Sequence, residues 1–305
     1  MTRIRSEPVS IFRLAHLSDP HLPPPKGAFG WRDLASKRLL SRIAWHRKHR
    51  EHQPNVLAAL VDDIKTYDPD HIALTGDLTN FSSTVEVEAA RIWLESLGPS
   101  DTVTVSPGNH DALVGSADPI RFSAWTPWLG DAPEPRFPGL RRRGDVAILN
   151  LCSALPTAPH LATGRLGEAQ LAALDTLLAD PAIQGAFRLV LIHHPPTRGA
   201  VSKRKALEDQ AGLAEVLARR GADLVLHGHA HEALVGSLPG PDGTAIPVLG
   251  VPSASAGGGG RHPAARWHGI EIELGQDGAF GIRVIARGLD PETGRPVELG
   301  RYRLV

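Results

Sequence analysis

Short apolar runs of strand length recur along the first 230 residues, and longer amphipathic stretches separate most of them. Many of the runs are rich in β-branched residues, as expected of buried strands, and they cover 11–17, 71–74, 102–105, 146–151, 187–192 and 222–226. Apolar residues at helical spacing occupy 55–67, 84–97, 167–180 and 206–220, and Ser82 and Ser83 provide a capping signal before the second of these. Strands that alternate with helices predict an α/β fold with a buried sheet.

The pattern changes after residue 231, where strand-like segments follow one another without a helix. They cover 244–251, 266–274, 280–289 and 297–305. We expect residues 232–305 to complete a second, mainly antiparallel sheet packed on the first. Segments rich in proline or glycine at 23–27, 131–139 and 257–263 are typical of loops rather than of linkers between domains. The whole chain, 1–305, is therefore predicted to form one domain.

Composition adds several exclusions. The 305 residues include 33 basic and 33 acidic side chains, so no net charge favours nucleic acid as a partner. The single cysteine, Cys152, excludes an intrachain disulfide. No apolar stretch reaches the roughly 18 residues of a membrane-spanning helix, which predicts a cytoplasmic protein. Fifteen histidines are many for this length, and several lie beside Asp, Asn or Gly, which suggests a metal site.

Side chains able to bind a metal ion follow five of the predicted strands. They are Asp19 and His21, Asp77, Asn109 and His110, His193 and His194, and His229 and His231. Each group alone is typical of an ordinary turn or loop. Because the carboxyl ends of strands converge in open α/β sheets, the five together favour a shared site. Imidazole and carboxylate ligands suit Mn, Fe or Zn, and one carboxylate can bridge two cations about 3.5–4 Å apart.

The ordered set "DPH … GD … GNHD … HHPP … GHAH", from residue 19 to 231, resembles the calcineurin-like metallophosphoesterases. This resemblance implies a four-layer α/β/β/α sandwich with a two-metal site at the strand ends. It implies that the first metal is bound by Asp19, His21 and His231, the second by Asn109, His193 and His229, and both by Asp77. His110 would contact the phosphoryl oxygen and assist the leaving group, and Asp111 would orient the His110 imidazole. His194 and Asn80 are candidates for substrate contact, and Asn80 is equally a candidate for a turn cap.

The "GNHD" and "HHPP" motifs resemble the bacterial branch that includes cyclic-nucleotide and glycerophosphodiester phosphodiesterases. The resemblance implies hydrolysis of a small phosphodiester by in-line attack of a hydroxide that bridges the two metals. One alternative is a membrane-associated hydrolase of a lipid-linked pyrophosphate or sugar-nucleotide precursor. A second alternative, a non-catalytic metal-binding scaffold, is disfavoured because all seven ligand positions and His110 are present.

The segment 32–50 between the first two motifs carries seven Arg or Lys residues among apolar ones and predicts a basic amphipathic helix. Three roles remain open. The helix would lie on an anionic membrane, line a groove for a phosphorylated or lipid-linked substrate, or pack on the domain with its basic side in water. The sequence determines neither the native metals nor the oligomeric state.

Overall fold

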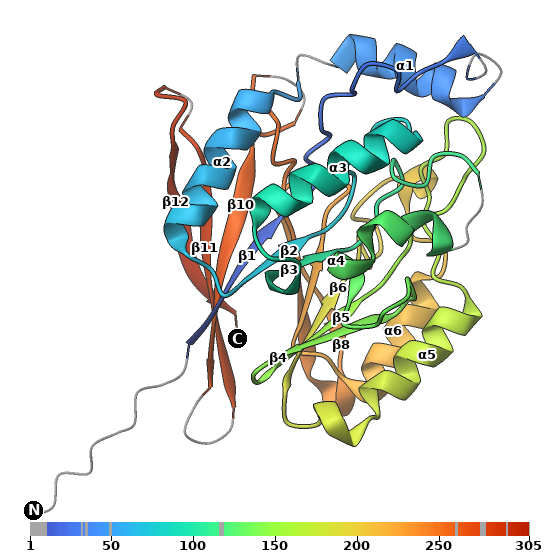
Figure 1. Ribbon diagram of the computed structural model, residues 1–305. Helices are drawn as coiled ribbons and strands as arrows, with labels where there is room; N and C mark the ends of the chain where they lie inside the picture. The colour runs from blue at the N-terminus through green and yellow to red at the C-terminus, as the bar shows by residue number, and fades with distance from the viewer. Residues whose placement is uncertain are drawn as a thin grey trace, which may run out of the picture.

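Two mixed six-stranded sheets pack face to face, and helices cover their outer faces (Figure 1). The computed structural model describes residues 11–31, 33, 36–48, 51–115, 119–259, 262–274, 279–290 and 292–304. The first sheet has the order β12 (Pro296–Leu304), β11 (Phe280–Leu289), β10 (Arg266–Leu274), β1 (Ile11–Leu17), β2 (His71–Leu74), β3 (Val103–Val105). The second has the order β4 (Gly139–Arg143), β5 (Val146–Asn150), β6 (Phe187–Leu191), β7 (Leu224–His227), β9 (Ala245–Gly250), β8 (Leu234–Pro239).

The helices supply the outer two layers. α2 (Pro54–Tyr67), α3 (Thr84–Leu97) and the short α4 (Thr126–Leu129) lie on the first sheet, and α5 (Glu168–Leu178) and α6 (Gln210–Arg220) lie on the second. α3 begins as its sequence predicts, because Ser83 and Glu86 form a reciprocal capping box. The predicted α/β/β/α arrangement is therefore confirmed.

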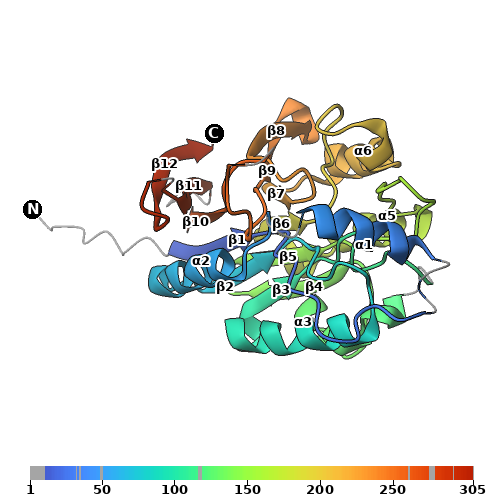
Figure 2. The ribbon, with the colours of Figure 1, turned by 90° about the horizontal axis from the view of Figure 1, so that it is seen from above.

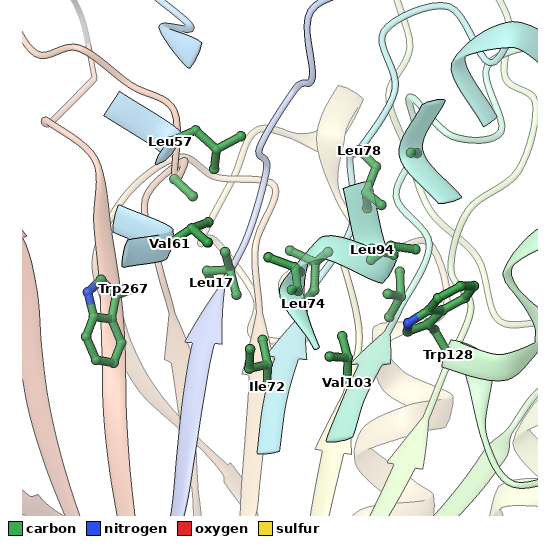
Figure 3. Close-up of a cluster of buried hydrophobic side chains, with 14 of the residues drawn as sticks. Leu17, Leu57, Val61, Ile72, Leu74, Leu78, Leu94, Val103, Trp128 and Trp267 are labelled. Atoms are coloured by element: carbon green, nitrogen blue, oxygen red, sulfur yellow. The ribbon is translucent and has the colours of Figure 1, made fainter. Parts of the chain in front are cut away.

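Three apolar clusters hold the layers together, one between the sheets and one under each helical layer. Figure 3 shows the cluster in which Leu57 and Val61 of α2 and Leu94 of α3 pack over Leu17 and Leu74. Full burial of one such side chain contributes about 1.5–3 kcal/mol. Trp125, Trp128 and Trp267 also belong to this cluster and are buried.

The strand ends of the first sheet lie level with one another. β1, β2 and β3 are parallel, and Leu17, Leu74 and Val105 are neighbours in register. In the second sheet β6 and β7 are also parallel, with Leu191 beside Leu226. The residues that follow these strands therefore emerge at one edge of the sandwich.

The C-terminal strands differ from their predicted placement. β10, β11 and β12 do not form a sheet of their own but extend the first sheet beside β1, whereas β9 joins the second sheet beside β7. β8, which the sequence pattern misses, pairs with β9 at the edge. Residues 232–305 thus complete both sheets, because strand pairing is decided by packing across the whole chain rather than by local periodicity.

α1 (Lys37–Lys48) lies across the top of the sandwich, over the strand ends (Figure 2). Arg38 donates hydrogen bonds to the carbonyl oxygens of Phe81 and Ser82, each at 2.8 Å, and Lys37 Nζ donates one to Leu161 O at 2.8 Å. The packing alternative assumed that the basic side of this helix lies in water. At the start of the helix, however, basic side chains also attach it to the domain. Residues 32, 34, 35, 49 and 50 of the basic segment lie outside the described residues. No helix among the described residues is long and apolar enough to cross a membrane.

Candidate metal centre

The loops after the parallel strands continue the pairing of those strands beyond the sheet. Asp19 N donates to Gly76 O at 3.0 Å and His21 N donates to Asp77 O at 3.0 Å. In the second sheet Gly228 N donates to His193 O at 3.1 Å. These bonds hold the predicted ligand loops against one another at the edge where the two sheets meet.

Asp19, His21 and His231 form one group of possible metal ligands, with one ligand atom from each lying within 4.8 Å of the others. His231 Nε2 lies 3.2 Å from Asp19 Oδ1 and 3.4 Å from His21 Nε2. This is the set that the resemblance implies for the first metal.

Asp77, His193 and His229 form a second group that meets the same criterion. Asn109 joins it, because its Oδ1 lies 3.2 Å from His193 Nε2. Asp77 Oδ2 lies 3.4 Å from His193 Nε2 in this group and 3.9 Å from His21 Nε2 in the first. The Asp77 carboxylate thus faces both groups, as a bridging ligand would.

The residues present fit two metal ions. His229 Nε2 is a buried polar atom without a hydrogen-bond partner among the described residues, which is costly unless a ligand binds it. The backbone is strained as well, since Asp19, His21, Asp77, His229 and His231 all have φ between 41° and 66°. Strain at five neighbouring non-glycine residues is typical of a functional site.

Burial and neighbouring charge place three of the donors, His21, His229 and Asp77, in ligand form. Burial lowers the pKa of His21 and of His229 well below the ordinary value, so both imidazoles are neutral. Burial acts to raise the pKa of Asp77, but His193 and His110 lower it, and the net result is a pKa well below the ordinary value. His193 Nδ1 lies 2.6 Å from Thr75 O and therefore carries the proton, which directs Nε2 to the site.

Glycine is required next to the ligands. A Cβ atom on Gly108 would lie 2.2 Å from Asp77 Oδ1, and one on Gly228 would lie 2.6 Å from Asp19 Oδ2. Both distances are far below van der Waals contact. These glycines allow the backbone to approach the carboxylates closely.

Asp111 makes different contacts from those expected. Its carboxylate accepts hydrogen bonds from the backbone N–H groups of Asp77, Gly108 and Thr79, at 2.8–2.9 Å. His110 Nδ1 instead lies 3.0 Å from the carbonyl oxygen of Asn80. Asp111 therefore joins the two ligand loops, and a backbone carbonyl orients the His110 imidazole.

The two candidates for substrate contact have different surroundings. His194 is fully buried, its Nδ1 lies 2.7 Å from Ser153 Oγ, and its ring packs 4.4 Å from the His229 ring. The His194 side chain packs against His229 and is not among the residues that line the cavity over the metal groups. Asn80 lines the cavity above the metal groups, yet its Nδ2 also donates to Leu22 O at 2.7 Å.

A cavity of about 240 Å³ lies over the two groups, and His110 faces it. Further residues that the sequence motifs do not mark also line this cavity, among them Trp45, His52, Lys205 and His262. The His52 ring lies 4.4 Å from the His21 ring, and its Nδ1 lies 2.8 Å from Ser255 Oγ. His52 has no signal in the sequence beyond its residue type, because it precedes α2 rather than following a strand.

Comparison with known proteins matches residues 12–233 to the family described as calcineurin-like phosphoesterase. A "probable cyclic nucleotide phosphodiesterase" of Synechococcus sp. is 31% identical over 224 residues, covering 71% of this chain and 77% of that protein. A protein of the same description from Rhodococcus erythropolis is 26% identical over 293 residues, covering 93% of this chain and 87% of its own length.

The fold has relatives among solved structures. The crystal structure of a dimetal phosphatase from Danio rerio superposes with a TM-score of 0.55 at 13% identity, covering 96% of this chain and 98% of that one. At this identity the likeness concerns the fold. It agrees with the two-sheet arrangement that carries the candidate site.

Proposed function

The chain belongs to the calcineurin-like phosphoesterases, and from this membership we propose that it hydrolyses small phosphodiesters with the help of two metal ions. The position of the Asp77 carboxylate supports the two-metal part of the proposal most directly. It lies between His21 of one ligand group and His193 of the other. A site for a single ion needs no such shared carboxylate.

In this proposal Asp19, His21 and His231 bind one ion, Asn109, His193 and His229 bind the other, and Asp77 binds both. Divalent ions in such a pair lower the pKa of a coordinated water and neutralise charge on the phosphoryl oxygens. The ligand types suit Mn, Fe or Zn.

His110 is proposed to donate a proton to the leaving oxygen. Its Nδ1 must carry a proton, because the Asn80 carbonyl beside it can only accept a hydrogen bond. The same carbonyl fixes the ring, which leaves Nε2 as the atom able to transfer a proton. His110 N also donates to Asp77 Oδ1 at 2.8 Å, so the ring and the proposed bridging ligand are held together.

Cyclic nucleotides are the first substrate class to test. The Synechococcus and Rhodococcus relatives both carry the description "probable cyclic nucleotide phosphodiesterase", and the aligned segments cover most of each chain. A cavity of about 240 Å³ directly over the metal groups suits a small diester.

Metal titration of the EDTA-treated protein tests the proposal, with bis(p-nitrophenyl) phosphate and 3′,5′-cyclic AMP as substrates. We expect turnover of both to require added Mn, Zn or Fe. His110→Ala should lower kcat for the cyclic nucleotide about 10²–10⁴-fold. It should lower kcat for bis(p-nitrophenyl) phosphate much less, because p-nitrophenolate leaves without a proton. Turnover that persists without metal would refute the metal dependence, and no turnover of 3′,5′-cyclic AMP above the His110→Ala background would favour the scaffold alternative.

Membrane contact through 32–50 stays a prediction. Co-sedimentation with anionic vesicles, lost when Arg42, Arg47, Lys48 and Arg50 are replaced together by Gln, would support it. Lack of binding by the parent protein would refute it.

A further inference from the structure

A second cavity, of about 290 Å³, opens beside the one over the metal groups. The two cavities share Ser41, Asn109, His110, Ala162 and Lys205 as lining residues. A substituent of a diester bound at the metal centre therefore enters this side pocket when it extends past Asn109 and His110.

Every charged side chain that lines the side pocket is basic. Lys37, Arg204 and Lys205 line it together with His160, and no Asp or Glu is among its lining residues in the described part of the chain. The remaining lining includes Leu113 and Leu161, which give the pocket an apolar wall. Such a pocket attracts an anion that is joined to an organic group.

Lys37 is the most enclosed of these cations. It is half-buried, and its Nζ donates to two neutral oxygens, Thr157 Oγ1 at 2.5 Å and Leu161 O at 2.8 Å. These partners fix the ammonium group without neutralising its charge. Burial lowers the pKa of Lys37, so an anion in the pocket would offset an existing desolvation cost.

Arg204 and Lys205, which line the side pocket, belong to the turn Lys203–Lys205. Ala162 N donates to Arg204 O at 2.9 Å, which ties this turn to the loop that binds Lys37. Lys205 lines both cavities and so joins the side pocket to the cavity over the metal groups.

We propose that the side pocket binds a second phosphate group of the substrate, so that the preferred substrates are phosphodiesters or phosphoanhydrides bearing one phosphate beyond the group that is cleaved. This inference rests on the proposed function and names its substrate class. Lys37, Arg204 and Lys205 are the specificity-determining residues. Both substrate forms present a second phosphate to the pocket. It is a separate phosphomonoester in one form and the adjacent phosphate of the phosphoanhydride in the other.

A matched pair of chromogenic substrates tests the monoester form: thymidine 5′-(p-nitrophenyl phosphate) and the same compound with a 3′-phosphate. The leaving group is identical, so the ratio of the two KM values isolates the second phosphate. Two exposed ion pairs of up to about 1 kcal/mol each predict that the 3′-phosphate lowers KM about tenfold. ADP-ribose, assayed by release of AMP, tests the anhydride form.

Arg204→Ala and Lys205→Ala should each reduce the KM ratio about threefold to fivefold. Lys203→Ala is the matched control, since this lysine lies in the same turn but does not line either cavity. It should leave the ratio unchanged. An equal reduction of the KM ratio in Lys203→Ala would show a general charge effect and overturn the assignment. A wild-type KM ratio near one for the thymidine pair, together with no release of AMP from ADP-ribose, would also overturn it.

Binding to the EDTA-treated protein gives a readout independent of catalysis. Isothermal titration should show thymidine 3′,5′-bisphosphate binding about tenfold more tightly than thymidine 5′-phosphate, and the preference should disappear in the Arg204→Ala/Lys205→Ala double variant. A preference that survives in the double variant would refute the side pocket. Failure to hydrolyse bis(p-nitrophenyl) phosphate would instead refute the proposed function, so the two failures are distinguishable.

Discussion

Replacing Asp111 with Ala separates two possible roles of this carboxylate. The motif implies that Asp111 orients His110. In the structure the Asp111 carboxylate instead accepts hydrogen bonds from the backbone N–H groups of Asp77, Thr79 and Gly108. Asp111 is 1% exposed, and all three donors are buried with it. The substitution therefore removes the acceptor that joins the loop after β2 to the loop after β3.

The cost follows from the three donors left behind. A buried donor without an acceptor costs about 1–3 kcal/mol, so three cost about 3–9 kcal/mol. Water that enters the vacated space satisfies part of this loss, and we expect the free energy of unfolding to fall by about 4 kcal/mol. The Thr79 hydroxyl adds little, because it also lies 3.0 Å from His110 O and keeps that partner.

Urea unfolding in EDTA measures the change without a contribution from bound metal. Asp111→Asn keeps one acceptor oxygen and should lose about half as much. Asp223→Ala is the control, because that carboxylate accepts a backbone N–H from Arg188 near the start of β6, away from the site. One result would refute the loop-joining role: Asp111→Ala loses less than about 1 kcal/mol of unfolding free energy and binds metal normally. In that case its kcat would also fall for the cyclic nucleotide but not for bis(p-nitrophenyl) phosphate, as expected for His110→Ala.

Three further predictions concern the loops and ligands. Gly108→Ala should reduce metal content, because its Cβ would lie 2.2 Å from Asp77 Oδ1. Gly300→Ala is the control, since the space around its Cβ is open, and it should keep normal metal content. Full metal occupancy in Gly108→Ala would contradict the close approach of the backbone to Asp77. Burial opposes protonation of His193, but Asp77 raises its pKa to about 9, so metal must displace a proton below that pH. Affinity of the EDTA-treated protein for Zn, measured by indicator competition, should rise about tenfold per pH unit from 7 to 9, and a flat profile would disprove the proton displacement. Asn80→Ala should cost about 1 kcal/mol of stability through the lost side-chain hydrogen bond and leave KM unchanged; a raised KM at normal stability would make Asn80 a substrate contact instead.

The layers and the candidate ligands follow from the sequence because both depend on local patterns. β1 and β2 have the predicted bounds, and Asp19 and Asp77 lie two and three residues beyond their ends. Parallel strands in register bring such residues to one edge without further information. A polar residue soon after an apolar run is therefore a reliable sign of a position at that edge.

Contacts that depend on distant partners are not predictable in this way. Arg141 belongs to a residue type that is mostly exposed, yet it is 1% exposed here because carbonyl oxygens of Ser100, Val103, Pro127 and Gly130 surround its guanidinium. These acceptors come from separate places in the chain, and no periodicity marks them. The same holds for the C-terminal strands, which divide between the two sheets.

Asp111 shows the limit within a motif. It follows His110 directly in the chain, yet its carboxylate lies on backbone amides of two loops while the His110 ring is held by Asn80. Adjacent side chains in a turn point in different directions, so adjacency in sequence does not predict contact. Residues without a motif, such as His52 and Lys205, reach the cavity only because α1, α2 and the Lys203–Lys205 turn pack around it.

The metal stoichiometry of Asp77→Asn tests the central claim most directly. The EDTA-treated wild-type protein, reconstituted with Mn or Zn and freed of excess ion, should retain two equivalents by elemental analysis. Asp77→Asn keeps the Oδ1 that accepts from His110 N, so its thermal unfolding should stay close to that of the metal-free wild type. We expect Asp77→Asn to lose both equivalents together with turnover. A variant that remains folded and still binds two equivalents would contradict the proposed role of Asp77 as a ligand of both ions.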